Sequence, residues 1–216
     1  MQALPPIIPG APYSRPERHD PIVALRQAIG SNESDDLKSY DMIWLEHLVG
    51  DVHQPLHGTV RYFSGKGDEG ANLVLIKLPL AMEKQFEGTQ SKSSPGELHA
   101  FWDDLPGEGQ PAPALPEAIS FAQPLPNAPA DRVADTDPSD WATESLTMAK
   151  LDAYSSPIGA GLQPAAPGSA SKSRGALSNS AYLITQAYYD KALQDAKDRI
   201  ALAGARLAKL LNENLK

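Results

Sequence analysis

Histidine and aspartate are concentrated in residues 44–57, which have the sequence WLEHLVGDVHQPLH. Apolar residues there repeat every three to four positions, which predicts a helix, so His47 and Asp51 should lie one turn apart on one face. Pro55 has no N–H and disfavours helix in the residue before it, so we expect the helix to end there. The turn that follows can bring His57 back beside the same face.

A second His-x-x-x-Asp pair, His99 and Asp103, occurs far along the chain in the sequence LHAFWDD, where we predict one short helical turn. With His57, the two pairs offer five nitrogen and oxygen ligands. Imidazole and carboxylate ligands suit zinc, and a zinc bound by two histidines and one carboxylate keeps a coordination position open. An open position is typical of catalytic rather than structural zinc.

A structural interpretation competes with the metal site. A single buried histidine is more often a hydrogen-bonded core residue than a ligand, and one His-x-x-x-Asp pair recurs by chance in many helices. Two such pairs with a shared histidine-rich turn favour the metal. We interpret His53, two residues from Asp51, as a structural residue that orients a ligand and does not itself bind metal.

Three motifs together resemble a known family: HLVGDVHQPLH at 47–57, DEGAN at 68–72 and LHAFWD at 98–103. They are similar to the zinc-dependent single-strand nucleases typified by nuclease S-one and nuclease P-one, whose all-helical fold is shared with zinc-dependent phospholipase C. The sequence ALAGARLAKLLN near the C-terminus resembles the closing helix of that family. The resemblance implies an all-α domain with long proline-rich loops.

The resemblance also implies which residues bind up to three zinc ions: His47, Asp51, His57, His99 and Asp103. The first two belong to one ion, from which Asp51 bridges to a second, and the last three hold the remaining ion. Asp51 would bridge two ions and Asn72 would contact substrate, which makes them the two catalytic residues. The implied reaction is hydrolysis of single-stranded DNA or RNA to 5′-phosphorylated products by a metal-activated hydroxide.

The chain departs from the family at its start. Family members begin with a zinc-binding tryptophan and a nearby histidine, followed later by an aspartate and a histidine, whereas this chain begins with Met1, and His19 is too close to His47 to be the upstream histidine. We therefore expect an N-terminally truncated member with one complete zinc site and feeble activity. Ala71 replaces the second glycine of Gly-Gly-Asn, and residues 84–94 form an insertion.

Length and composition fit one domain over residues 1–216. The chain is 41% hydrophobic, and its net charge of −8 argues against a broad basic surface for nucleic acid. It has no cysteine and no signal-peptide pattern, and its longest apolar run is too short to span a bilayer. By family we expect a secreted or periplasmic monomer that needs no stable protein partner and acts on single-stranded nucleic acid or nucleotides.

Caps and apolar periods predict helices over residues 21–29, 35–54, 99–103, 138–151 and 179–214. The last helix carries a stripe at steps of seven, Leu193, Ile200 and Leu207 beside Ala196, Ala203 and Leu210, which indicates core. No convincing alternating strands occur. We expect an extended arm at 1–19 and irregular loops at 104–136 and 159–175.

Some alternatives stay open. Tyr62 and Phe63, in a glycine-rich loop, could stack on a base, although we favour packing against the scaffold. A phospholipase C-like hydrolase would use the same fold and ligands. A catalytically impaired zinc-binding remnant would keep the fold without the reaction.

Overall fold

The computed structural model describes residues 20–63, 66–83, 96–106, 119–120, 122–158 and 181–215. The expected arm at 1–19, the insertion at 84–94 and the loop at 159–175 lie outside the described residues.

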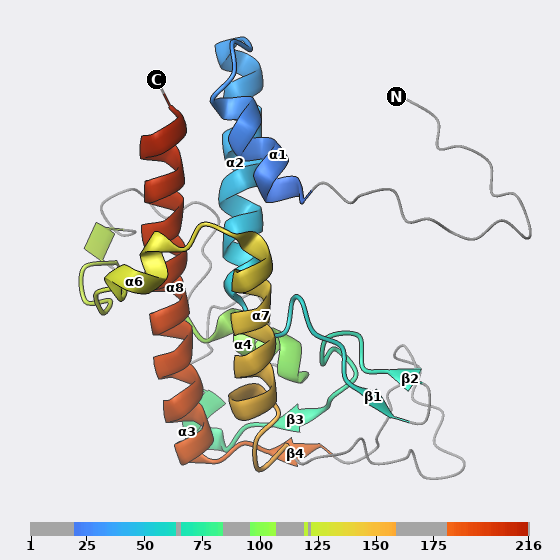
Figure 1. Cartoon of the computed structure of the whole chain (residues 1–216). Helices are drawn as coiled ribbons and strands as arrows, with labels where there is room; N and C mark the ends of the chain where they lie inside the picture. The colour runs from blue at the N-terminus through green and yellow to red at the C-terminus, as the bar shows by residue number, and fades with distance from the viewer. Residues whose placement is uncertain are drawn as a thin grey trace, which may run out of the picture.

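Helices dominate the described part of the chain, so the predicted all-α class is confirmed. The longest, α8 (Gln186–Asn214), spans the height of the molecule, and α2 (Asp35–His53) runs along its upper half (Figure 1). Helix α7 (Pro138–Met148) packs against α2 and continues into a π-helical turn, η2 (Ala149–Ala153). The short helix α1 (Pro21–Ile29) lies against both α2 and α8.

Side-chain caps set the helix starts. The Asp20 carboxylate accepts a hydrogen bond from the backbone N–H of Ile22 at 2.8 Å, and Pro21 occupies the first turn of α1. Asp137 caps α7 in the same way, by accepting from the N–H of Ser139 at 2.9 Å. Both starts agree with the prediction from Asp-Pro pairs.

The final helix begins later than predicted, at Gln186 instead of about 179. Residues Tyr182–Leu183 form strand β4, which pairs in parallel with β3 (Ile76–Lys77). Thr185 then caps α8 by accepting a hydrogen bond from the N–H of Tyr188. A cap residue and a strand pairing therefore displace the first turns of the expected helix.

Other short elements also escaped the prediction. Strand β1 (Tyr62–Phe63) pairs antiparallel with β2 (Lys66–Gly67). Elements this short have too few residues to show a period. The same is true of the one-turn helix α3 (Leu80–Glu83). Helix α6 (Ala130–Ala134) is a single turn within residues 104–136, a stretch that we expected to be irregular with room for one helical turn.

Two apolar clusters form the core, and α8 contributes to both. The first, the α4 core, surrounds α4 (Leu98–Asp104) and includes Leu56, Val74, Leu98, Phe101, Trp102, Ile184, Tyr188 and Ala196. The second, the α1 core, joins α1, α2, α7 and the C-terminal half of α8 and consists of Ile22, Ile29, Leu45, Val49, Trp141, Ala203 and Leu210. The stripe predicted on the last helix is thus core at Ala196, Ala203 and Leu210.

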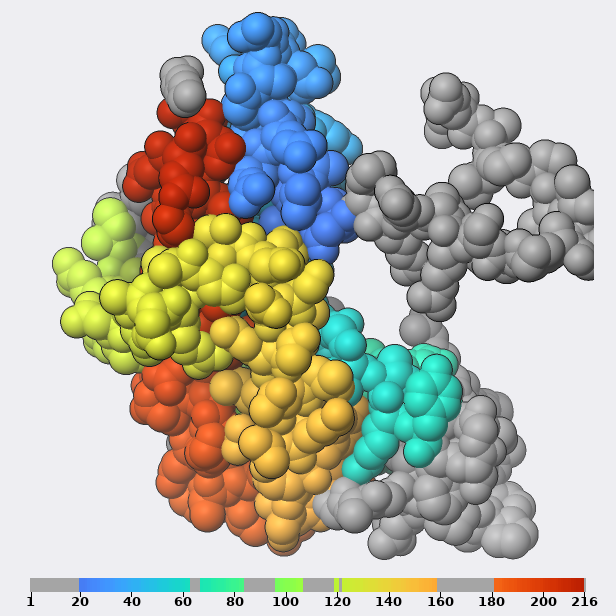
Figure 2. Space-filling view, viewed as in Figure 1, coloured from blue at the N-terminus to red at the C-terminus, as the bar shows by residue number. Residues whose placement is uncertain are grey.

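The face seen in Figure 2 is formed by α1, α6, α7 and α8 together with the start of α2, and the segment after α2 projects beside α7. That segment, residues 54–61, connects α2 to β1 and places His57 beside Asp103 of α4. Within the described residues, no helix combines the length and apolar character that a membrane crossing requires.

Candidate metal centre

The five side chains predicted to bind zinc form one continuous row. Asp51 contacts His47 through Oδ2, 3.3 Å from Nε2, and contacts His57 through Oδ1, 3.2 Å from Nδ1. Asp103 lies 3.1 Å from His57 Nε2 through Oδ1 and 3.5 Å from His99 Nε2 through Oδ2. The structure therefore brings together both His-x-x-x-Asp pairs and the histidine of the turn.

Helix ends and a proline place these residues. Helix α2 ends at His53, and the chain turns at Pro55, whose carbonyl accepts a hydrogen bond from Thr59 Oγ1 at 2.9 Å. Leu56 is fully buried in the α4 core, and the next residue, His57, contacts Asp103 on α4. On α4 itself, His99 and Asp103 are one turn apart, as the spacing predicted.

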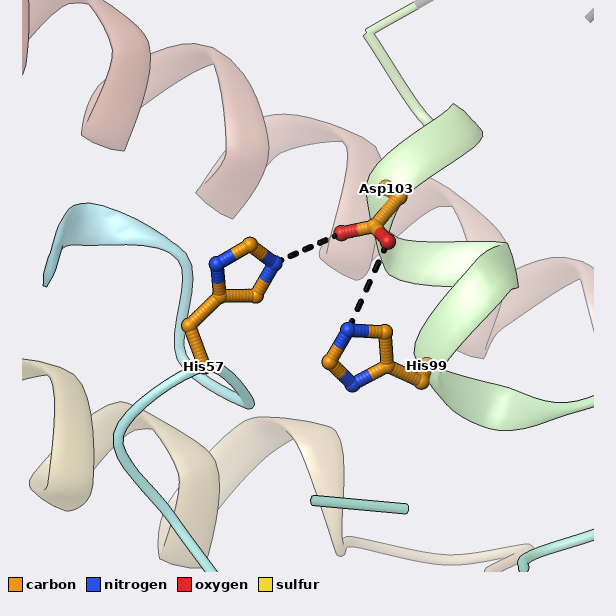
Figure 3. A group of neighbouring side chains, drawn as sticks. All are labelled: His57, His99 and Asp103. Atoms are coloured by element: carbon orange, nitrogen blue, oxygen red, sulfur yellow. Dashed lines mark hydrogen bonds and ion pairs between the residues drawn. The ribbon is translucent and has the colours of Figure 1, made fainter. Parts of the chain in front are cut away.

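His57, His99 and Asp103 form a group that meets the geometric requirement for a metal ion. Each offers one donor atom, and these atoms lie within 4.8 Å of one another (Figure 3). The two imidazole rings are stacked, with centroids 5.0 Å apart and planes 5° apart. Two imidazoles and one carboxylate are a donor set that zinc accepts with a position left open, so the residues fit the ion that the sequence predicts.

A backbone carbonyl fixes the tautomer of His99. Its Nδ1 lies 2.6 Å from the carbonyl oxygen of Gly70, and since a carbonyl only accepts, Nδ1 carries the proton. The lone pair is then on Nε2, which faces Asp103. A hydrogen bond of this kind orients metal-binding histidines and makes them more basic.

The loop that supplies this carbonyl has an unusual backbone. Glu69, Gly70 and Ala71 have positive φ values of 53°, 65° and 69°. Buried Asp68 holds the start of the loop, because Oδ1 accepts from the N–H of Arg61 at 2.9 Å and Oδ2 accepts from the Tyr154 hydroxyl at 2.8 Å. Strained residues of this kind persist only where the surroundings hold them.

Gly70→Ala is expected to loosen the three-residue group. A Cβ at this position would lie 2.8 Å from the carbonyl oxygen of Leu56, and φ is left-handed, so we expect a loss of about 1–3 kcal/mol in unfolding free energy and a lower zinc affinity. Gly58→Ala is the matched control, because a Cβ there meets nothing within 4 Å. Denaturant unfolding and zinc titration of both variants check this, and equal behaviour of the two would contradict it.

Electrostatics favour charged forms at the centre. The hydrogen bond to Asp103 outweighs the effect of burial and raises the pKa of His57. Burial alone would raise the pKa of Asp103, but hydrogen bonds from His57 and Gln54 lower it instead. Asp103 is thus an anion that can bind a cation, and protons compete with the cation for His57.

Gln54 is a site residue that the sequence did not single out. Its Nε2 donates to Asp103 Oδ1 at 2.8 Å, and its Oε1 accepts from the N–H of Leu56. It therefore ties the turn after α2 to the carboxylate on α4. In the sequence, only its position between His53 and His57, at the predicted end of a helix, pointed to a role in the site.

His53 is structural, as predicted, but it orients no ligand. Its Nδ1 donates to the Val49 carbonyl at 2.7 Å, so Nε2 accepts from Arg206 Nη1 at 2.9 Å, and both ring nitrogens are occupied away from the centre. Burial, followed by the charge of Arg199, lowers the pKa of His53 to about 3, so the ring is neutral.

The arginine that contacts His53 belongs to a buried network that sequence analysis missed. Glu144 accepts from Arg199 Nη1 at 2.7 Å and from Arg206 Nη1 and Nη2, each at 2.9 Å. Arg199 Nε also donates to the His53 carbonyl at 2.9 Å, at the end of α2. Burial alone would raise the pKa of Glu144, but the bonds from Arg206 and Arg199 lower it to about 2.

Two loop residues gave mixed outcomes. The Asn72 side chain donates to the Glu69 carbonyl at 2.8 Å, so it is held within its own loop, and a substrate contact stays a prediction. Tyr62 is 71% exposed, so our preference for packing against the scaffold is wrong for this residue. The side chain of Phe63 lies outside the described residues.

An open cleft of about 460 Å³ gives access to the centre. Its lining includes Asp51, His57 and His99 and, from the start of α1, Asp20 and Pro21. A second cavity of about 320 Å³ lies between α2, α4 and α8, and its lining does not include His57, His99 or Asp103. The cleft that reaches the ligand atoms is therefore the one relevant to chemistry.

Comparison with known proteins identifies the family. Neither the curated proteins nor the solved structures contain a match to the chain. The model of the family described as S1/P1 Nuclease matches residues 21–216, which include both pairs, the turn and the loop around Gly70. The helices of the structure agree with the all-α fold of that family. Because the match covers most of the chain, the chain belongs to the S1/P1 nuclease family.

Proposed function

We propose that this chain is a zinc-dependent nuclease that hydrolyses phosphodiester bonds in single-stranded DNA or RNA and leaves 5′-phosphorylated products. The observation that carries the proposal is the group of His57, His99 and Asp103, whose donor atoms lie within 4.8 Å at an open cleft. Membership of a nuclease family supports the phosphodiester as the bond that is broken.

Zinc held by these three residues would polarise a phosphate oxygen and lower the pKa of a bound water to about 7. The protein's own part is positional. Gly70 fixes the ring of His99, and Gln54 and His57 hold the Asp103 carboxylate in its charged form.

Asp51 is the residue that we propose to connect two ions. Its Oδ2 lies 3.3 Å from His47 Nε2, and its Oδ1 lies 3.2 Å from His57 Nδ1, on the opposite side of that ring from the Nε2 that faces Asp103. The carboxylate could bind the ion of His47 through one oxygen and a further ion, distinct from that of the three-residue group, through the other. The His47 side chain is 60% exposed and stands at the edge of the row, which leaves this second site with fewer ligands. We therefore expect weaker binding there than at the three-residue group.

The substrate follows from charge and access. Since the net charge is −8, the metal centre has to supply the positive charge that attracts a phosphate. An unpaired strand is flexible and can place one phosphate at the bottom of a cleft. We propose that Asn72, in the loop beside the centre, contacts the substrate, and that the enzyme acts outside the cytoplasm, as is general for the family.

The zinc-loaded chain is expected to keep one zinc firmly after gel filtration and to cleave single-stranded DNA faster than duplex DNA or phosphatidylcholine. Elemental analysis measures the zinc, and gel assays with and without a chelator measure cleavage. Asp103→Asn should remove the firmly bound zinc. A folded chain that binds no zinc at neutral pH, or that cleaves equally well with the chelator, would refute the proposal.

A further inference from the structure

A row of exposed rings leads along α2 to the metal centre. Tyr40 and Trp44 are in edge contact with ring centroids 6.3 Å apart, and Trp44 is in edge contact with His47 at 5.8 Å. Each ring is about one helical turn from the next. The row ends at His47, which contacts Asp51 at 3.3 Å.

The exposure of these rings is not explained by packing. Tyr40 is 59% and Trp44 is 44% exposed, whereas the other two tryptophans, Trp102 and Trp141, are buried in the two cores. Seven residues separate Trp44 from Asp51, which is about 10 Å along a helix axis. If one phosphate of an extended strand lies at the metal centre, bases of neighbouring nucleotides can reach Trp44 across this distance.

We propose that Tyr40 and Trp44 form a stacking site for unpaired bases of the strand that is cleaved. This inference rests on the proposed function, because it concerns the substrate of the same centre. Aromatic side chains stack on any base, since every base has a π-face, and the interaction tolerates all sequences. Bases inside a duplex have both faces covered, so such a site selects single strands.

The charge around the row agrees with stacking rather than with phosphate binding. The same helix carries five acidic residues and one lysine: Asp35, Asp36, Asp41, Glu46, Asp51 and Lys38. Acidic residues repel the phosphates of a strand but not the neutral faces of its bases. Binding at the row should therefore depend weakly on salt, because few phosphates are neutralised by lysine or arginine.

The test is a binding measurement with the zinc-loaded chain. The probes are oligothymidylate and an abasic strand of equal length, both dye-labelled and with phosphorothioate linkages that resist cleavage. We expect oligothymidylate to bind about tenfold or more tightly and to quench the fluorescence of Trp44. Equal affinity for the two strands would overturn the stacking site, whereas failure of both strands to bind would refute the proposed nuclease function instead.

Variants separate stacking from general apolar contact. Trp44→Leu should remove most of the preference for oligothymidylate, as read by anisotropy, while Trp44→Phe should restore part of it and zinc affinity at the three-residue group should stay unchanged. Ile43→Ala is the matched control, because Ile43 is on the same helix, is 67% exposed and is not aromatic. A loss with Ile43→Ala as large as that with Trp44→Leu would overturn the inference.

Discussion

Asp51→Asn is expected to slow cleavage of single-stranded DNA by the zinc-loaded chain by about 10²- to 10⁴-fold. The substitution keeps the shape of the side chain but removes the charge that faces both His47 and His57. If the carboxylate connects two ions, one change weakens both sites. Single-turnover assays with the protein in excess make a small rate measurable.

His53→Gln is the matched control for Asp51→Asn. It lies two residues away, and its ring nitrogens contact Val49 and Arg206 rather than the centre. We expect the variant to keep much of its activity at a temperature where it is folded. Full activity of Asp51→Asn, together with loss of activity in Asp103→Asn, would show that one zinc is enough and that Asp51 has no metal-bridging role.

Glu144→Gln is expected to lower the free energy of unfolding by about 3–5 kcal/mol, because it removes the carboxylate paired with buried Arg199 and leaves buried Arg206 with only Asp135 among the described carboxylates, at 3.5 Å. Arg199 and Arg206 are 3% and 0% exposed, so solvent cannot replace the carboxylate. The control is Glu213→Gln, which breaks a solvent-exposed pair with Lys209 on α8 and should cost about 0.5 kcal/mol or less. Denaturant unfolding at pH 7 measures both, and similar losses would contradict the role of the network.

The same network sets a direction for pH dependence. The pKa of Glu144 is lowered to about 2, so the stability that it contributes is present above its unfolded pKa and is lost as the pH falls toward 2. His53 has its pKa lowered to about 3, so the unfolded state gains a proton first and stability falls from about pH 6.5 toward pH 3. The free energy of unfolding of the metal-free chain should therefore decrease with falling pH over both the His53 range and the Glu144 range. In Glu144→Gln the decrease over the Glu144 range should be smaller.

The residues of the candidate metal centre could be predicted because the spacing that brings them together is local in the sequence. The spacing of His47 and Asp51, and of His99 and Asp103, places each pair on one helical face without knowledge of the rest of the fold. Pro55 marked the end of α2 and hence the turn toward α4. Five side chains that converge from two elements were therefore visible as two short patterns and one turn.

The supporting residues could not be predicted in the same way. Arg199 and Arg206 are in phase with the buried side of α8, but charged residues are expected on the solvent face, and their partner Glu144 lies more than 50 positions away. The bond from His99 to Gly70 uses a backbone carbonyl, which no side-chain pattern reveals. Strands β3 and β4 have two residues each, and the paired residues Ile76 and Tyr182 are 106 positions apart in the sequence.

The division of the interior into two cores has a consequence for how the centre responds to fluctuations. His57 follows Leu56 of the α4 core, and His99 and Asp103 stand on α4, whereas His47 and Asp51 lie on α2 beside the α1 core. A local opening that detaches α1 and loosens α2 would separate the second pair of ligands and leave the three-residue group whole. Amide hydrogen exchange should then divide into two cooperative units, with bound zinc slowing exchange in α4 more than in α1.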